Sequence, residues 1–284
     1  MKTNGIRACK LRRDKKGVSA AISTVILTSA VVVMLLVTVV FANNFLNARM
    51  AENEFGAVKQ FMQTVGLQID DIAWTIGRTQ TIRYATRFGH LNFESLALNY
   101  TVYVNDDSSP VANFSTGVLL FSMPIDKYNV GNNYHERILP SSNRVFLQKG
   151  TSAPVNHVYV IEKIPMNDGN YIRVVVAPSV RMLNSTITTN GSPKNYYNFY
   201  LPILLQGTHP RNSQSVTLMA NSVSVETEGS VSRVRIHLDF PKSGMGYDNT
   251  FFRFDRVDEE INVTSGSIME FYTGEVIVSL GLYI

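Results

Sequence analysis

The chain has 284 residues, of which 45% are hydrophobic, and it carries 26 Lys and Arg against 22 Asp and Glu. This composition excludes wholesale disorder, and the length suffices for one large or two ordinary domains. Seven of the basic residues but only one acidic residue lie in residues 1–17, so the rest of the chain has 19 basic and 21 acidic groups, a net charge of −2. A basic nucleic-acid-binding face is therefore not expected. The one cysteine, Cys9, excludes an intramolecular disulfide and a cysteine-based metal site.

The segment after the basic leader is long enough to cross a membrane. Residues 18–42 carry no charge, and Ser and Thr are their only polar members. As a helix they would extend about 37 Å, more than the roughly 30 Å of a hydrocarbon core. The positive-inside rule places residues 1–17 in the cytoplasm and residues 43–284 outside, which predicts a single-pass membrane protein. The side chains expected to face lipid or a filament core include Ile22, Val25, Ile26, Leu27, Val33, Leu35 and Leu36.

Three interpretations of this N-terminus are open. A secretory signal could be cut after Val40-Phe41-Ala42, but such signals have an apolar region of only about 7–15 residues. An uncleaved signal anchor would keep the leader attached to the helix and agrees with the charge pattern. The third interpretation depends on the amino-acid sequence at the junction between the leader and the apolar segment.

That junction reads Lys15-Lys16-Gly17-Val18-Ser19 and continues as Ala20-Ala21-Ile22-Ser23-Thr24-Val25-Ile26-Leu27-Thr28. Over about residues 12–45 it resembles the archaeal type IV pilin family, whose basic class III leader ends in glycine. The resemblance implies that a prepilin peptidase cuts between Gly17 and Val18, and that a pilus assembly platform transfers the subunit into a helical filament. Bacterial type IV pilins have a glutamate at the fifth mature position, where this chain has Ile22.

A second helical pattern follows the apolar segment over residues 43–78. Apolar residues recur at alternating intervals of three and four, which is the spacing of one helix face. This packing stripe consists of Phe55, Val58, Met62, Val65, Ile69, Ile72 and Ile76, and Gly77 is the expected helix stop. Packing against the chain's own β domain is the first expectation for the stripe. A coiled-coil contact with another subunit is the alternative.

From residue 79 onward the period changes to that of β-strands. Val234, Ile236, Leu238 and Phe240 alternate with polar residues, as in a half-buried strand. Further strands are expected at residues 81–87, 98–105, 117–124, 145–148, 157–164, 170–177, 196–205, 215–226, 250–256 and 268–283. The predicted fold class is therefore α+β, with a long N-terminal helix followed by a large antiparallel β-sandwich region over residues 79–284. One sandwich, or two with a boundary near residue 190, are both open.

Catalytic, metal and cofactor motifs are not found in the sequence. The five histidines are all more than four residues apart, and neither a nucleophile elbow nor a phosphate loop occurs. We therefore expect no catalytic residues, no metal site and no cofactor. Five sequons offer candidate N-glycosylation sites at Asn99, Asn113, Asn184, Asn190 and Asn262.

The sequence thus predicts a subunit of a type IV pilin-like surface filament. It would be stored in the membrane, would self-associate through its N-terminal helix, and would present an exterior β domain for adhesion or surface contact. A membrane-anchored extracellular β domain, acting as adhesin or sensor with an uncleaved leader, is the main alternative. An anchored exoenzyme is the third.

Overall fold

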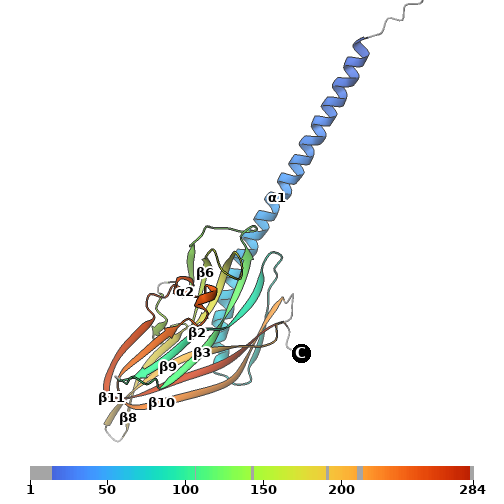
Figure 1. Cartoon of the computed structure of the whole chain (residues 1–284). Helices are drawn as coiled ribbons and strands as arrows, with labels where there is room; N and C mark the ends of the chain where they lie inside the picture. The colour runs from blue at the N-terminus through green and yellow to red at the C-terminus, as the bar shows by residue number, and fades with distance from the viewer. Residues whose placement is uncertain (1–14, 106, 142–143, 190–191, 210–213, 282–284) are drawn as a thin grey trace, which may run out of the picture. The chain divides into compact units, whose positions relative to one another are not determined.

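The computed structural model describes residues 15–105, 107–141, 144–189, 192–209 and 214–281. The chain divides into two compact units, one ending at Arg49 and one beginning at Met50. The expected long N-terminal helix followed by a large strand-rich region is confirmed (Figure 1). Residues 190–191 lie between two strands that pair with each other, so the strands on both sides of residue 190 belong to one sheet.

Helix α1 spans Lys15–Ala73. It ends earlier than the sequence predicted, because the chain turns after Ile72, whose carbonyl accepts a hydrogen bond from the Thr75 amide at 2.9 Å. Gly77 then takes a positive φ of 80° and donates its amide to the Ala220 carbonyl at 3.1 Å, which directs the chain into the sheet. Ile76 was therefore wrongly assigned to the helical stripe. It lies beyond the helix and is 65% exposed.

The strand region in the described residues forms one hydrogen-bonded sheet of eleven strands. Its spatial order is β4-β6-β7-β3-β2-β10-β11-β9-β8-β5, and β1 pairs with β10. The strands are β1 (Thr79–Arg83), β2 (His90–Val104), β3 (Ala112–Pro124), β4 (His135–Leu139), β5 (Leu147–Lys149), β6 (Asn156–Glu162), β7 (Tyr171–Pro178), β8 (Val180–Thr189), β9 (Ser192–Gln206), β10 (Ser215–Asp239) and β11 (Asp258–Leu280).

The prediction of a purely antiparallel sandwich is corrected to a mixed sheet. Strand β11 pairs antiparallel with β10 on one edge and parallel with β9 on the other, and β5 pairs parallel with β8. Alternating apolar residues report which side of a strand is buried, but they do not report the direction of its neighbour. The sheet also curves back on itself, since the Leu204 amide of β9 donates to Thr116 Oγ1 of β3 at 2.8 Å, although these strands are not paired.

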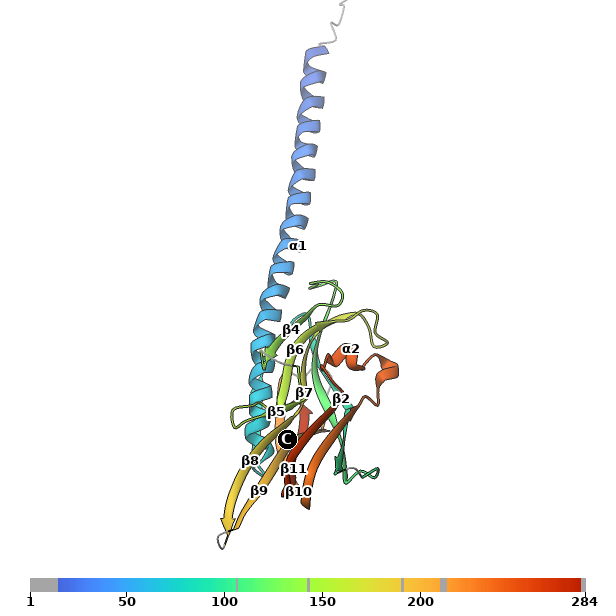
Figure 2. The same ribbon diagram turned by 90° about the vertical axis from the view of Figure 1, so that its left-hand side faces the viewer.

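The second half of α1 packs on one face of this sheet (Figure 2). The six members of the stripe other than Ile76 are at most 3% exposed. They share a hydrophobic cluster with strand residues such as Phe121 and Val160. The opposite face of the sheet encloses a second cluster that contains Tyr100, Phe199 and Phe271. The helix stripe is thus part of the core of the unit that begins at Met50.

Two local expectations were wrong. Residues 250–256 were expected to form a strand, but helix α2 (Asn249–Phe252) occupies this segment because Asp248 caps it. The Asp248 side chain accepts hydrogen bonds from the amides of Thr250 and Phe251. Strands β4 and β8 were not expected, since every β4 residue is only half-buried and the second half of β8 is largely exposed. Such strands show no clear apolar alternation.

Candidate functional site

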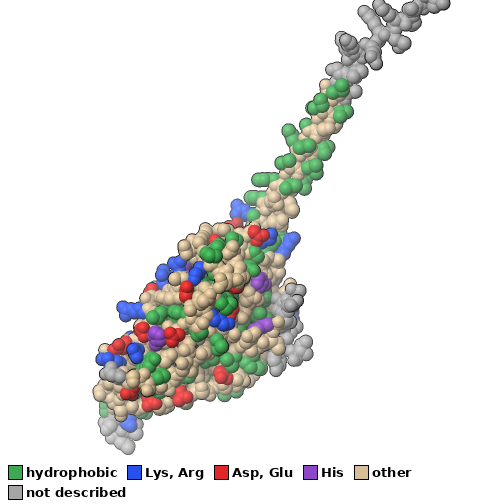
Figure 3. Space-filling view, viewed as in Figure 1, with side chains coloured by type: hydrophobic (Ala, Val, Ile, Leu, Met, Phe, Trp, Pro, Cys, Tyr) green, Lys and Arg blue, Asp and Glu red, His purple; other side chains and the backbone are tan. Residues whose placement is uncertain are grey.

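The candidate site of this chain is the apolar surface of α1 in the unit that ends at Arg49. Large apolar side chains from Ile22 to Leu46 are exposed on all sides of the helix, between 49% for Val31 and 70% for Phe41. Figure 3 shows this run of hydrophobic side chains along the helix. The predicted lipid- or core-facing residues are all among them: Ile22, Val25, Ile26, Leu27, Val33, Leu35 and Leu36 are 54–68% exposed.

The hydroxyl groups in this segment bond to the helix itself. Thr28 Oγ1 donates to the Thr24 carbonyl at 2.9 Å, and Ser29 Oγ donates to the Val25 carbonyl at 2.8 Å. Thr38 Oγ1 donates to the Met34 carbonyl at 2.7 Å. Because these donors are satisfied within the helix, they need no water, and the surface can be covered by lipid or by other apolar side chains.

Length and hydropathy make this helix able to cross a membrane. Its most apolar 18-residue window has a mean hydropathy of 2.9, and none of that window is buried. The segment ends at a polar boundary, where Asn43 and Asn44 precede Arg49. The Arg49 guanidinium lies 5.4 Å from the centre of the Phe45 ring. Amphipathic and cationic residues at such a boundary are typical of the edge of a membrane-embedded segment.

The predicted leader junction lies at the beginning of the helix. The backbone of Lys15, Lys16, Gly17 and Val18 is helical, and residues 1–14 lie outside the described residues. Cleavage after Gly17 therefore stays a prediction of the sequence. The Gly17–Val18 bond and the exposed segment from Ile22 belong to one continuous helix.

The candidate glycosylation sites lie on strands of the sheet. Asn113 on β3, Asn184 on β8 and Asn262 on β11 are exposed. Asn99 on β2 is half-buried, and its Oδ1 accepts a hydrogen bond from Ser115 Oγ at 2.9 Å. Asn190 lies outside the described residues. Attachment of glycans at these positions stays a prediction.

The sheet brings together polar groups that sequence reasoning did not connect. His237 Nδ1 lies 2.8 Å from Asp258 Oδ1, and its Nε2 lies 3.0 Å from Asp239 Oδ1. Partial burial lowers the pKa of His237, but the hydrogen bonds to both carboxylates raise it above its usual value overall. Among the described residues, no nucleophile is bonded to this half-buried histidine, so the arrangement fits a surface ion-pair network better than a catalytic triad. In the part of the chain that the structure describes, no group of three or more His, Cys, Asp or Glu is arranged to hold a metal ion.

Comparison of the chain with protein-family models, with curated proteins and with solved structures finds no match.

Proposed function

We propose that this chain is a pilin-like subunit of a surface filament. In this proposal, residues 18–42 hold the subunit in the membrane until the leader is removed after Gly17. The same residues then form the filament core together with those of neighbouring subunits. The observation that carries the proposal is the helical segment from Ile22 to Leu46, which is free of charged residues and exposes apolar side chains on all sides.

The physical argument concerns what can cover that surface. Each large aliphatic side chain left in water costs about 1.5–3 kcal/mol relative to burial, so about fifteen of them would cost on the order of 20–45 kcal/mol. A bilayer and a bundle of identical helices both remove this cost. Transfer from one to the other keeps the apolar surface covered throughout.

The filament geometry follows from the nature of the contact. Helices from successive subunits would meet through different faces, and such heterologous contacts grow along a screw axis without closing. The membrane, a prepilin peptidase and an assembly platform are the partners that this proposal requires. The strand-rich unit would then form the outer sheath, placed to contact surfaces or other cells.

Processing at Gly17 is the sharpest test. We would replace Gly17 with Val, purify the protein from membranes and from sheared surface material, and determine its N-terminal residue. The wild-type chain is expected to begin at Val18 and to yield filaments in electron cryomicroscopy. The G17V chain is expected to stay in the membrane with its leader intact and to form no filaments.

A matched control keeps the leader charge. The K15R/K16R variant preserves both charges and Gly17, so it should be processed and assembled normally. An intact Met1 on wild-type protein from the cell surface would instead indicate a membrane-anchored β domain. Normal filament yield from G17V would contradict the leader assignment.

A further inference from the structure

Three arginines from separate segments line one surface cavity in the unit that begins at Met50. The enclosed space between these side chains holds about one water molecule, so a larger group would sit at its open mouth, among the ends of the side chains. Its polar side chains are those of Arg137 and His135 on β4, His157 and Tyr159 on β6, Arg144 before β5, and Arg253 after α2. None of the described residues that line it is acidic. No local sequence pattern marks this cluster, because its members are spread over about 120 residues.

Strand pairing places the first wall of the cavity. Arg137 is the register partner of Tyr159, and His135 is the partner of Ile161. Side chains two residues apart on a strand share a face, so His135 and Arg137 lie on the same side as His157 and Tyr159. The rings of His135 and Tyr159 stack with their centres 5.2 Å apart, which fixes the orientation of the histidine.

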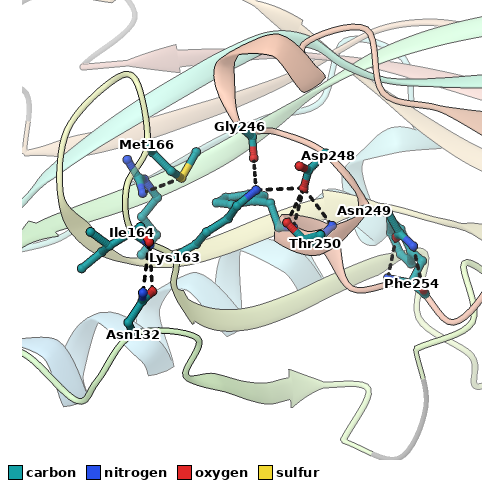
Figure 4. Close-up of polar contacts among 11 residues, drawn as sticks. Asn132, Lys163, Ile164, Met166, Gly246, Asp248, Asn249, Thr250 and Phe254 are labelled. Atoms are coloured by element: carbon teal, nitrogen blue, oxygen red, sulfur yellow. Dashed lines mark hydrogen bonds and ion pairs between the residues drawn. The ribbon is translucent and has the colours of Figure 1, made fainter.

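The segment after α2, which contributes Phe252, Arg253 and Phe254 to the lining, is held by the hydrogen bonds of Asp248 and Asn249 that Figure 4 shows. Asp248 caps helix α2 and accepts a hydrogen bond from Lys163 Nζ at 2.9 Å. Asn249 bonds to both the amide and the carbonyl of Phe254 at 3.1 Å. Arg253, between them, has a left-handed backbone with φ 55° and ψ 38°. This conformation is costly for a residue other than glycine, and it persists only where surrounding contacts fix it.

The cavity concentrates positive charge with little compensation. Among the described residues, no carboxylate lies within ion-pair distance of Arg137, Arg144 or Arg253, and the Arg253 guanidinium donates only to the Asn133 carbonyl at 3.1 Å. Burial first, and then all three guanidinium groups, lower the pKa of His135 to about 4. Burial also lowers the pKa of His157 to about 4, although nearby Asp255 acts in the opposite direction. Both histidines are therefore neutral at pH 7.

Half-buried like charges repel one another, and a bound anion relieves that repulsion. Guanidinium groups form paired hydrogen bonds with carboxylate and phosphate oxygens, which gives such sites both strength and geometry. We propose that this cavity, the Arg137–Arg144–Arg253 site, binds a single oxyanionic group such as sulfate, phosphate or carboxylate. The site lies wholly within residues 135–254 and does not depend on the filament proposal.

Isothermal titration calorimetry on the full chain in detergent tests this site, with sodium sulfate as titrant and the ionic strength held constant with chloride. Saturable binding is expected, and the R137Q/R144Q variant should bind at least tenfold more weakly. The control R83Q/R87Q removes two exposed arginines and the same net charge from elsewhere in the unit, so its affinity should equal that of the wild type. No saturable binding by the wild type, or equal losses in both variants, would overturn the proposal.

A second variant keeps the test decisive if R137Q/R144Q does not fold. R137K/R144K preserves the charge but not the planar fork, and it should weaken binding at least threefold while its circular dichroism stays unchanged. Unchanged affinity in a folded R137K/R144K chain would overturn the assignment to the guanidinium groups. Dextran sulfate, with neutral dextran as control, distinguishes the source of the anion. If dextran sulfate binds more than tenfold tighter per sulfate group than sodium sulfate, the natural ligand is a group carried on a polymer. If the two bind equally tightly per sulfate group, it is a free ion.

Discussion

Asn156 on β6 donates a hydrogen bond from its Nδ2 to the carbonyl of Gly66 near the C-terminal end of α1, at 2.9 Å and fully buried. The two residues are 90 positions apart, and this bond joins the helix directly to β6. A Cβ at position 66 would lie 2.7 Å from Val158 Cγ2. Gly66 thus allows the backbone of the helix to reach β6.

Replacing Gly66 with Ala should therefore destabilise the chain despite the better helix propensity of alanine. Overpacking costs about 1–3 kcal/mol, and the propensity gain offsets at most about 1 kcal/mol of it. We expect a net loss of about 1–2 kcal/mol in the free energy of unfolding, measured by denaturant titration in detergent. Gly56 is the matched control, since nothing lies within 4 Å of a Cβ there and G56A should be neutral or stabilising. Equal effects of G66A and G56A would contradict the close approach.

Glu54 of α1 is predicted to hold the loop between β1 and β2. Its carboxylate accepts hydrogen bonds from the Thr86 hydroxyl and from the amides of Arg87, Phe88 and Gly89, the amide distances being 2.9–3.3 Å. Removing a charged acceptor from several amides costs about 1–3 kcal/mol. The E54A variant should show much faster hydrogen exchange at these amides. The N53A variant, which alters an exposed neighbour, should not change it.

Acid should destabilise the strand-rich unit through His157. Its pKa is about 4 in the folded chain and about 6.5 when unfolded, so the unfolded state binds more protons between these values. The free energy of unfolding should therefore fall by roughly 3 kcal/mol from pH 7 to pH 4, and His135 adds a loss of the same sign. His237 acts oppositely, because its raised pKa gives stability below pH 6.5 that is lost as the pH rises through the folded pKa. An H157Q variant with an unchanged pH slope would refute the assignment.

A charge in the apolar half of α1 should prevent both membrane storage and assembly. A lysine at the centre of a membrane helix costs about 2.5–3.5 kcal/mol on the insertion scale. Leu35→Lys should therefore reduce the membrane fraction and abolish filaments, measured by carbonate extraction and electron microscopy. Leu67→Lys changes a residue that is 49% exposed later in the same helix, and it should assemble normally. Filaments at normal yield from L35K would contradict the proposed role of this surface.

The sequence alone indicated the helical parts of the chain well, because their signals are local. The uninterrupted apolar run from Val18 and the three-and-four spacing from Phe55 to Ile72 are properties of neighbouring turns of one helix. The prediction that Ile76 belongs to the stripe failed because its spacing continues the pattern, but a turn after Ile72 ends the helix. The strand expected at residues 250–256 was wrong because the aromatic residues of this segment are buried in the core, as they would be in a strand. They extend instead from the short helix α2 and the turn that follows it.

What the sequence by itself determined is therefore the apolar helix, its second stripe, and the change to strand periodicity after residue 79. Only the tertiary structure decided the parallel pairing of β9 with β11, the close approach at Gly66, and the meeting of Arg137, Arg144 and Arg253. Periodicity records which face of a segment avoids water, and this depends on residues close in sequence. Strand order, direction and register join segments that are far apart in sequence, and no local pattern encodes which segments meet.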